Sequence, residues 1–75
     1  MVELLTFLIK NITGSDDFTV SENRNGRDVE LTVKANPEIV GLIIGKEGKT
    51  IKNMRRILGI RASKENISVH INVTE

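Results

Sequence analysis

Cysteine, tryptophan and tyrosine are absent from this 75-residue chain, which contains only one histidine, one proline and two phenylalanines. The absence of cysteine excludes disulfides, thiolate catalysis and cysteine-ligated zinc sites, and a single histidine cannot build a histidine-rich metal centre. No nucleophile–base pair and no carboxylate pair stands at a spacing that suits catalysis. The sequence therefore predicts a protein that is not an enzyme and that uses no cofactor and no metal.

A long hydrophobic run is also lacking. The apolar segment 1–12 is too short to span a bilayer, and Glu3 and Lys10 interrupt it. It has neither the positive start nor the small-residue cleavage site of a secretory signal, so we expect a soluble cytoplasmic protein. Hydrophobic residues make up 39% of the chain and charged residues 28%, a composition that folds. The length predicts one domain, residues 1–75.

The net charge is only +1, but its distribution is uneven. Residues 1–44 hold four Lys/Arg against seven Asp/Glu, a net of −3, and the last eleven residues contribute −2. Residues 45–64 hold seven Lys/Arg against one acidic residue, a net of +6. A local charge of this size favours a polyanionic partner, although a solvated helix face would explain the charge alone equally well.

Hydrophobic periodicity predicts the elements of the first half. Residues 2–12 repeat apolar side chains at the spacing of an amphipathic helix. Alternating apolar and polar residues predict strands at 18–21 and 28–33. Asn25-Gly26 between them is a strong hairpin signal, because both residues tolerate positive φ. These two strands are therefore expected to pair antiparallel.

The second half begins with a compact helix-start signal. Residues 36–38, Asn-Pro-Glu, supply an N-cap, a proline for the first helical position and an acid that complements the helix dipole. This helix is expected to end at Gly45, and a second helix to run from 49 to about 58 with Gly59 as its stop. A last strand is predicted at 67–73. The side chains expected to face inward from the second helix are Ile51, Met54, Ile57 and Leu58.

The predicted order is helix, strand, strand, helix, helix, strand. It indicates an α+β domain in which one three-stranded sheet is covered on one face by three helices. Gly41, inside a helix, is expected to permit close packing, because glycine otherwise costs helix stability. His70 lies on the polar side of the last strand and is interpreted as a solvated residue rather than a ligand.

The short connection Gly45-Lys46-Glu47-Gly48 is the most informative segment. Two helices joined so tightly leave unpaired amides at the start of the second helix, which attract phosphate oxygens together with the helix dipole. The glycines remove the Cβ atoms that would hold a sugar-phosphate backbone away. Lys46 adds charge at the tip, whereas Glu47 is expected to point to solvent or to pair with a neighbouring lysine.

Other phosphate-binding motifs fit this segment poorly. Gly48-Lys49-Thr50 resembles the end of a P-loop, but the earlier glycine of that motif would fall at Ile43, and the preceding segment is predicted to be helical. The glycine spacing of a dinucleotide-binding fingerprint is absent. A tight turn explains the two glycines singly, but not the basic tip, the basic helix and the flanking apolar residues together.

That combination resembles the KH domain, whose pattern is an apolar pair, Gly-x-x-Gly and a further apolar residue three positions on. The matching residues are Ile43, Ile44, Gly45, Gly48 and Ile51. The order of elements resembles the type II, prokaryotic form, and the resemblance covers the whole chain. The short chain is further similar to the small stand-alone bacterial KhpA (YlqC-type) RNA-binding proteins. The resemblance implies a mixed sheet.

The resemblance also implies that the loop clamps the backbone of about four single-stranded nucleotides while the bases lie in a groove. The residues expected to bind nucleic acid are Ile44, Gly45, Lys46, Glu47, Gly48, Lys49, Thr50, Ile51, Lys52, Arg55, Arg56 and Arg61. Ile44, Ile51 and the outer edge of the last strand would line the groove, although Ile51 could equally belong to the core. The basic residues would add affinity without sequence information, and scarce aromatics exclude stacking platforms, which predicts weak binding with loose sequence preference.

A protein-interaction module is the competing interpretation. Leu4 and Phe7 widen the apolar face of the first helix, which would suit a homodimer contact, although a layer of three helices also needs a wide face. The resemblance implies a second RNA-binding partner of the Jag type. It further implies a role in RNA regulation or as a chaperone-like RNA binder.

Overall fold

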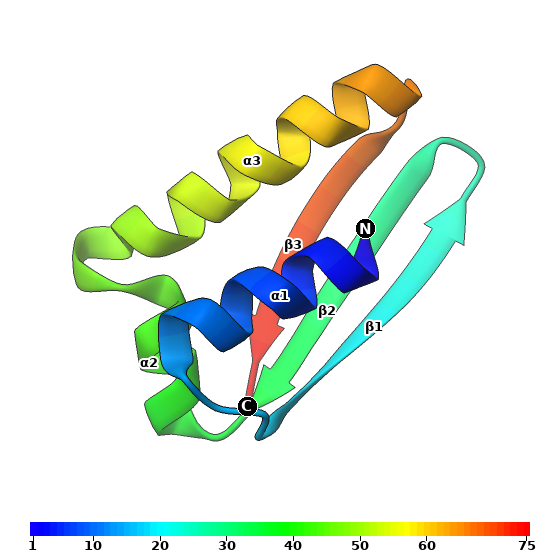
Figure 1. The fold of residues 1–75 in the computed structure, drawn as a ribbon. Coiled ribbons are helices and arrows are strands. Elements are labelled where there is room, and N and C mark those ends of the chain that lie inside the picture. Colours follow the sequence, from blue (N-terminus) through cyan, green and yellow to red (C-terminus); the bar gives the residue numbers. More distant parts are fainter.

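The computed structural model describes all residues 1–75 and confirms the expected order of elements (Figure 1). The elements are α1 (Val2–Thr13), β1 (Phe18–Asn25), β2 (Asp28–Ala35), α2 (Pro37–Ile44), a short 3-10 turn η1 (Lys46–Gly48), α3 (Lys49–Glu65) and β3 (Ser68–Thr74). None of the helices has the length and apolarity needed to cross a membrane.

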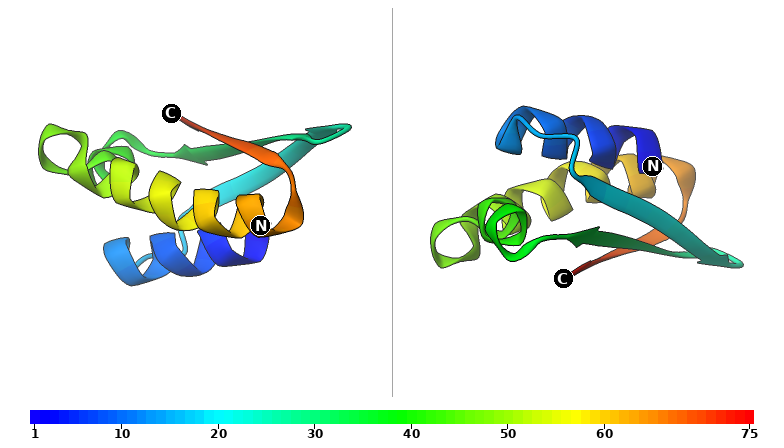
Figure 2. Two further views of the ribbon diagram at one scale, coloured as in Figure 1. Left: turned by 90° about the horizontal axis from the view of Figure 1, so that it is seen from above. Right: turned by 90° about the horizontal axis from the view of Figure 1, so that it is seen from below.

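The three strands form one mixed sheet in the order β1-β2-β3. β1 pairs antiparallel with β2, whereas β3 runs parallel to β2. The views from above and below show all three helices on the same side of this sheet (Figure 2). The architecture is therefore the predicted α+β domain, with the mixed sheet that the family resemblance implied.

The core lies between the sheet and the helices. Its fully buried side chains come from α1, β2, α2 and α3, and they are Leu5, Ile9, Val29, Leu31, Val33, Ile43, Met54 and Leu58. β2 is the central strand, so its alternate residues face this core and the intervening ones face outward. The outward face of the sheet is lined by polar side chains such as Ser21, Glu30 and His70, which explains why no helix covers it.

The hairpin forms as predicted, but its loop is shifted by one residue. Asn25 pairs with Asp28 as the last residues of the two strands, and Gly26 and Arg27 make the two-residue loop. Gly26 has a φ of +64°, as the first loop position of a type II′ turn requires. Asn25 is therefore a strand residue, and only the glycine supplies the positive φ.

The prediction that α3 stops at Gly59 is wrong. The helix continues to Glu65 and ends at Asn66, which has φ 57° and ψ 44° and whose backbone N–H donates to the carbonyls of Ala62 and Ser63. Ala62 is 3% exposed in the longer helix, whereas Ile57, expected to face inward, is 43% exposed. Ile57 falls outside the stripe at spacings of three and four that the buried residues of α3 follow.

The interpretation of Gly41 is also wrong. A Cβ atom at this position would meet no atom within 4 Å, so no close packing depends on the glycine. Asn36, in contrast, acts as the predicted N-cap of α2, because its Oδ1 accepts a hydrogen bond from the backbone N–H of Ile39 at 2.9 Å. The Asn-Pro-Glu signal therefore predicts the start of α2 correctly.

Candidate functional site

The connection between α2 and α3 requires glycine at its first position. Gly45 has φ 75° and ψ 177°, a backbone conformation that is almost exclusive to glycine. A Cβ atom there would overlap Thr50 Oγ1 and lie 2.6 Å from Thr50 Cβ. The backbone N–H of Gly45 donates to the carbonyl of Gly41 at 2.9 Å. Gly45 therefore permits both a sharp exit from α2 and close approach of the start of α3.

The chain then reverses through two left-handed residues. Glu47 has φ 57° and Gly48 has φ 74°, and the N–H of Gly48 donates to the carbonyl of Gly45 at 3.2 Å. A left-handed conformation is uncommon for a residue such as glutamate, so the tip holds local strain. The Glu47 side chain is exposed and forms no ion pair, in agreement with the expectation that it points to solvent.

The first turn of α3 is left uncapped by side chains. Gly48 occupies the N-cap position, and no side chain accepts a hydrogen bond from the amides that follow. The N–H of Lys49 donates to the carbonyl of Lys46 within the loop. α3 is 17 residues long, so a full helix dipole is aimed at this exposed turn.

Positive side chains surround the uncapped turn and have no intramolecular partner. All of them are exposed, and none takes part in an ion pair or a side-chain hydrogen bond: Lys46, Lys49, Lys52, Arg55 and Arg56. Arg61 differs, because its Nε donates to Glu65 Oε2 at 3.0 Å. It also lies roughly 120° around the helix from Arg55. The structure therefore groups five of the predicted cations and sets Arg61 apart.

β3 provides the second wall of the site. α3 and β3 approach each other at their connection and diverge toward the α2–α3 loop (Figures 1 and 2). A shallow hollow between them is lined by Arg55 and by residues 69–72. A second hollow lies further along, where α3 ends and β3 begins. Arg55, from the basic side of α3, and the edge of β3 thus border one surface.

The free edge of β3 presents backbone groups to this surface. The N–H of Ser68 donates to the carbonyl of Arg27 at 2.8 Å, so Ser68 turns its backbone toward β2. In a parallel pair the residues that do so alternate. The N–H and C=O groups of Val69, Ile71 and Val73 therefore point to the free edge, where they can bond a ligand.

The predicted apolar residues occupy two different environments. Ile44 is 40% exposed at the end of α2, so Ile44 is available to contact a ligand. Ile51 is 8% exposed and belongs to the hydrophobic core. Thr50 is half-buried beneath Gly45 and supports the loop from below.

His70 and Asn72 are exposed on the outward face of the sheet, which agrees with the interpretation of His70 as a solvated strand residue. Both also border the hollow beside Arg55, at the edge of β3. The sequence interpretation included the outer edge of the last strand but named none of its residues, and strand alternation alone does not reveal that β3 is the edge strand next to α3.

The order of elements, the mixed sheet and the Gly-x-x-Gly loop between two helices define a type II KH domain. The family model described as "KhpA/KhpB, KH domain" matches residues 2–73. The chain therefore belongs to this family of KH domains, which are binding domains rather than enzymes, as the sequence predicts.

Curated relatives align along almost the whole chain. The RNA-binding protein KhpA of Chlamydia caviae is 38% identical over 100% of this chain and 97% of its own length. The RNA-binding protein KhpA of Clostridium acetobutylicum is 32% identical over 97% of this chain and 99% of its own length. No solved structure matches the chain significantly.

Proposed function

We propose that this protein binds single-stranded RNA by clamping its backbone with residues 45–48. The observation that carries the proposal is the exposed, uncapped start of α3, which is bounded by two positive-φ glycines and surrounded by five unpaired cations. Unpaired amides and a helix dipole bind phosphate oxygens. The relatives named as RNA-binding proteins support RNA as the polyanion.

The mode of binding follows from the groups that the groove contains. Phosphates would contact the loop amides and Lys46, and the strand would continue past Lys49 and Lys52 along α3. The unstacked bases would lie between α3 and β3, where the free backbone groups of Ile71 offer a donor and an acceptor to a base edge. No Phe, Tyr or Trp lines the hollows beside α3 and β3, so affinity would come mostly from phosphate contacts.

Such a binding mode suits a protein that acts on many RNAs. Phosphate contacts carry no sequence information, so sequence preference would be loose. We propose a role in RNA regulation or as a chaperone-like RNA binder. A cytoplasmic location, expected from the sequence, stays a prediction.

The direct test is a double substitution in the loop. Lys46→Asp with Glu47→Asp places two negative charges where the phosphates would lie, and both side chains are exposed, so the fold should survive. Aspartate also tolerates the left-handed conformation at position 47. We expect measurable binding of a labelled eight-nucleotide RNA to disappear in fluorescence polarisation, with an unchanged circular dichroism spectrum.

A matched control distinguishes a local effect of the loop on RNA binding from an effect of the protein's net charge. Lys10→Asp makes the same change of two charge units on α1, where Lys10 Nζ contacts only Asp16 at 3.1 Å. Its RNA affinity should stay within about twofold of the wild type, since an exposed ion pair contributes little to stability. Equal loss in both variants would show that the loop is not the binding site.

Self-association is a second candidate function, favoured by exposed apolar side chains on the helices. Phe7 is 63% exposed on α1, whereas Leu4 is half-buried against the core, so only one member of the predicted pair stays available. A homodimer through α1 would leave both RNA grooves open, and one through residues 45–48 would hide them. A partner of the Jag type is the hetero-association that the family resemblance implies.

Analytical ultracentrifugation with and without an eight-nucleotide RNA distinguishes these associations. A dimer through α1 should persist with RNA and be lost in Phe7→Ser, whereas a dimer through the loop should dissociate when RNA is added. A monomer at high micromolar concentration in both conditions would remove the homodimer. A larger species only on mixing with a second family member would favour the hetero-association.

A further inference from the structure

The hollow at the far end of the groove has no part in the clamp. It lies where α3 ends and β3 begins, has a volume of about 660 Å³ and is lined by residues of α3, β3 and the β1–β2 turn. Gly59 and Ser63 stand about 16 and 22 Å from Gly48 along the helix. A strand held at residues 45–48 would therefore reach this hollow only with nucleotides beyond those that the loop holds.

Gly59 leaves one wall of this hollow without a side chain. A glycine inside a helix costs about 1 kcal/mol relative to alanine, and neither of the usual structural reasons applies here. Its φ is not positive, and a Cβ atom would meet no atom within 4 Å. Gly59 lines the hollow, so a side chain at this position would occupy it. Ser63, one turn further on, is the next residue on the same helix face.

The polar groups around the hollow suit a nucleotide. Arg27, from the β1–β2 turn, is exposed and has no ion-pair partner, and no acidic side chain lines the hollow. The side chain of Asn66 forms no hydrogen bond within the protein, so its amide is free to bond a base edge. Residues 68–70, at the edge of β3, complete the lining.

Resting on the proposed RNA binding, we infer that this hollow is a second nucleotide subsite, which takes an unstacked nucleotide beyond the four held at the loop. Arg27 contacts its phosphate, the Asn66 side-chain amide bonds the edge of its base, and Gly59 leaves the space that the base occupies. The subsite lengthens the bound segment and adds affinity that the loop alone does not supply.

The experiment compares random-sequence RNA probes of four and eight nucleotides in fluorescence polarisation. The number of binding positions alone should raise the affinity for the longer probe about fivefold, because eight nucleotides offer five positions to a four-nucleotide clamp. A hydrogen bond between Arg27 and a phosphate is charge-assisted, so we expect the wild-type preference to exceed this by about tenfold or more. Gly59→Leu should bring the preference back to about fivefold and leave the four-nucleotide affinity within about twofold.

Two controls accompany this variant. Gly41→Leu makes the same change at another exposed helical glycine with free space around it, outside the hollow, and should keep the wild-type preference. Arg27→Ala should lower only the eight-nucleotide affinity, whereas Arg24→Ala, on the same hairpin, should not. Thermal melts should show that both leucine variants are at least as stable as the wild type, since both replace a helical glycine.

The outcomes keep the two proposals apart. Failure of the wild type to bind either probe would overturn the RNA-binding proposal and the subsite with it. Binding of both probes with a wild-type preference of only about fivefold would overturn the subsite and leave the clamp intact. Equal behaviour of Gly59→Leu and Gly41→Leu would likewise overturn it.

Discussion

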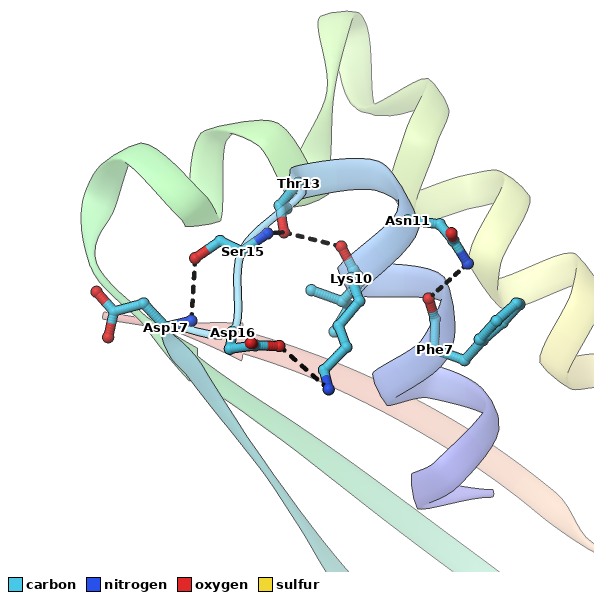
Figure 3. Close-up of polar contacts among 8 residues, drawn as sticks. Phe7, Lys10, Asn11, Thr13, Ser15, Asp16 and Asp17 are labelled. Atoms are coloured by element: carbon cyan, nitrogen blue, oxygen red, sulfur yellow. Dashed lines mark hydrogen bonds and ion pairs between the residues drawn. The ribbon is translucent and has the colours of Figure 1, made fainter.

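The connections that follow α1 and α2 both begin at a positive-φ glycine, but they use their polar groups differently. After α1, Thr13 Oγ1 donates to the carbonyl of Ile9 at 2.8 Å and accepts from the N–H of Ser15 at 3.2 Å (Figure 3). Ser15 Oγ accepts from the N–H of Asp17 at 3.0 Å, and Lys10 pairs with Asp16. This connection satisfies its own hydrogen-bonding groups.

The α2–α3 connection contains only backbone hydrogen bonds. The N–H groups of Gly45 and Gly48 donate to carbonyls of Gly41 and Gly45, while the side chains of Lys46 and Glu47 form no hydrogen bond and no ion pair. Both connections are on the surface and both redirect the chain. The first connection bonds its own polar side chains, whereas the second leaves its charged side chains without partners.

The largest expected effect is on the free energy of unfolding, and it distinguishes Gly45 from Gly14, the glycines at which the two connections begin. Gly45→Ala combines a backbone conformation that alanine avoids with overlap against Thr50, and should lower the free energy of unfolding by about 2–4 kcal/mol. Gly14→Ala has free space around its Cβ and should lose only about 1 kcal/mol from its left-handed φ of 67°. Urea unfolding measures both, and equal losses would contradict a special role for Gly45.

Salt should weaken RNA binding, and this effect should depend on the charges of the α2–α3 connection alone. About three phosphate contacts at about −0.7 each give a slope near −2 for log affinity against log salt, or about a sixteenfold loss between 50 and 200 mM. The Lys46→Asp, Glu47→Asp variant and the Lys10→Asp control are compared in the same titration, and only the control should keep this slope. A flat wild-type response would mean that the local charge of +6 is merely solvated.

Removing a hydroxyl should weaken the α1–β1 connection without affecting RNA. Thr13→Val leaves the N–H of Ser15 without its partner and should lower the free energy of unfolding by about 1 kcal/mol. Thr6→Val, whose hydroxyl forms no hydrogen bond within the protein, serves as the control on the same helix and should change little. RNA affinity should stay within about twofold in both, and a coupled loss of affinity in Thr13→Val would show that the two connections do not act independently.

The smallest expected effect is the change in stability when Glu47 or Asn66, the two non-glycine residues with left-handed backbone, is replaced. Glu47→Asn should raise the free energy of unfolding by about 0.5 kcal/mol, because asparagine adopts this conformation more readily. Asn66→Glu, with the same φ of 57° at the end of α3, should lower it by a similar amount. Chemical unfolding of the two variants tests the strain at the loop tip, and a loss of stability in Glu47→Asn would exclude it.

Local signals in the sequence predict most of the fold. Alternation places the strands, the Asn-Pro-Glu start places α2, and the spacing of Gly45 and Gly48 places the loop. Gly59 led to the wrong end of α3, because a glycine after an apolar stripe is found both at helix ends and inside helices. The burial of Ala62 shows that α3 continues. Periodicity alone therefore cannot fix where this helix ends.

Hydrophobic alternation predicts neither the direction of β3 nor its position beside α3. Apolar residues alternate in the same way in parallel and antiparallel strands. The parallel pairing depends on the crossover through α2 and α3, and the free backbone groups of Ile71 depend on the register that joins Ser68 to Arg27. The loop half of the candidate site is predictable from sequence, whereas the β3 half requires the fold.

The most direct test of the central claim is a ¹H–¹⁵N NMR titration with an eight-nucleotide RNA, in which both connections are observed in one experiment. We predict that the amides of residues 45–50 and of the facing parts of α3 and β3 shift progressively, while those of residues 14–17 stay unchanged. Shifts confined to residues 14–17 or to the outward face of the sheet, or no shifts at millimolar RNA, would contradict the assignment of the α2–α3 connection as an RNA clamp.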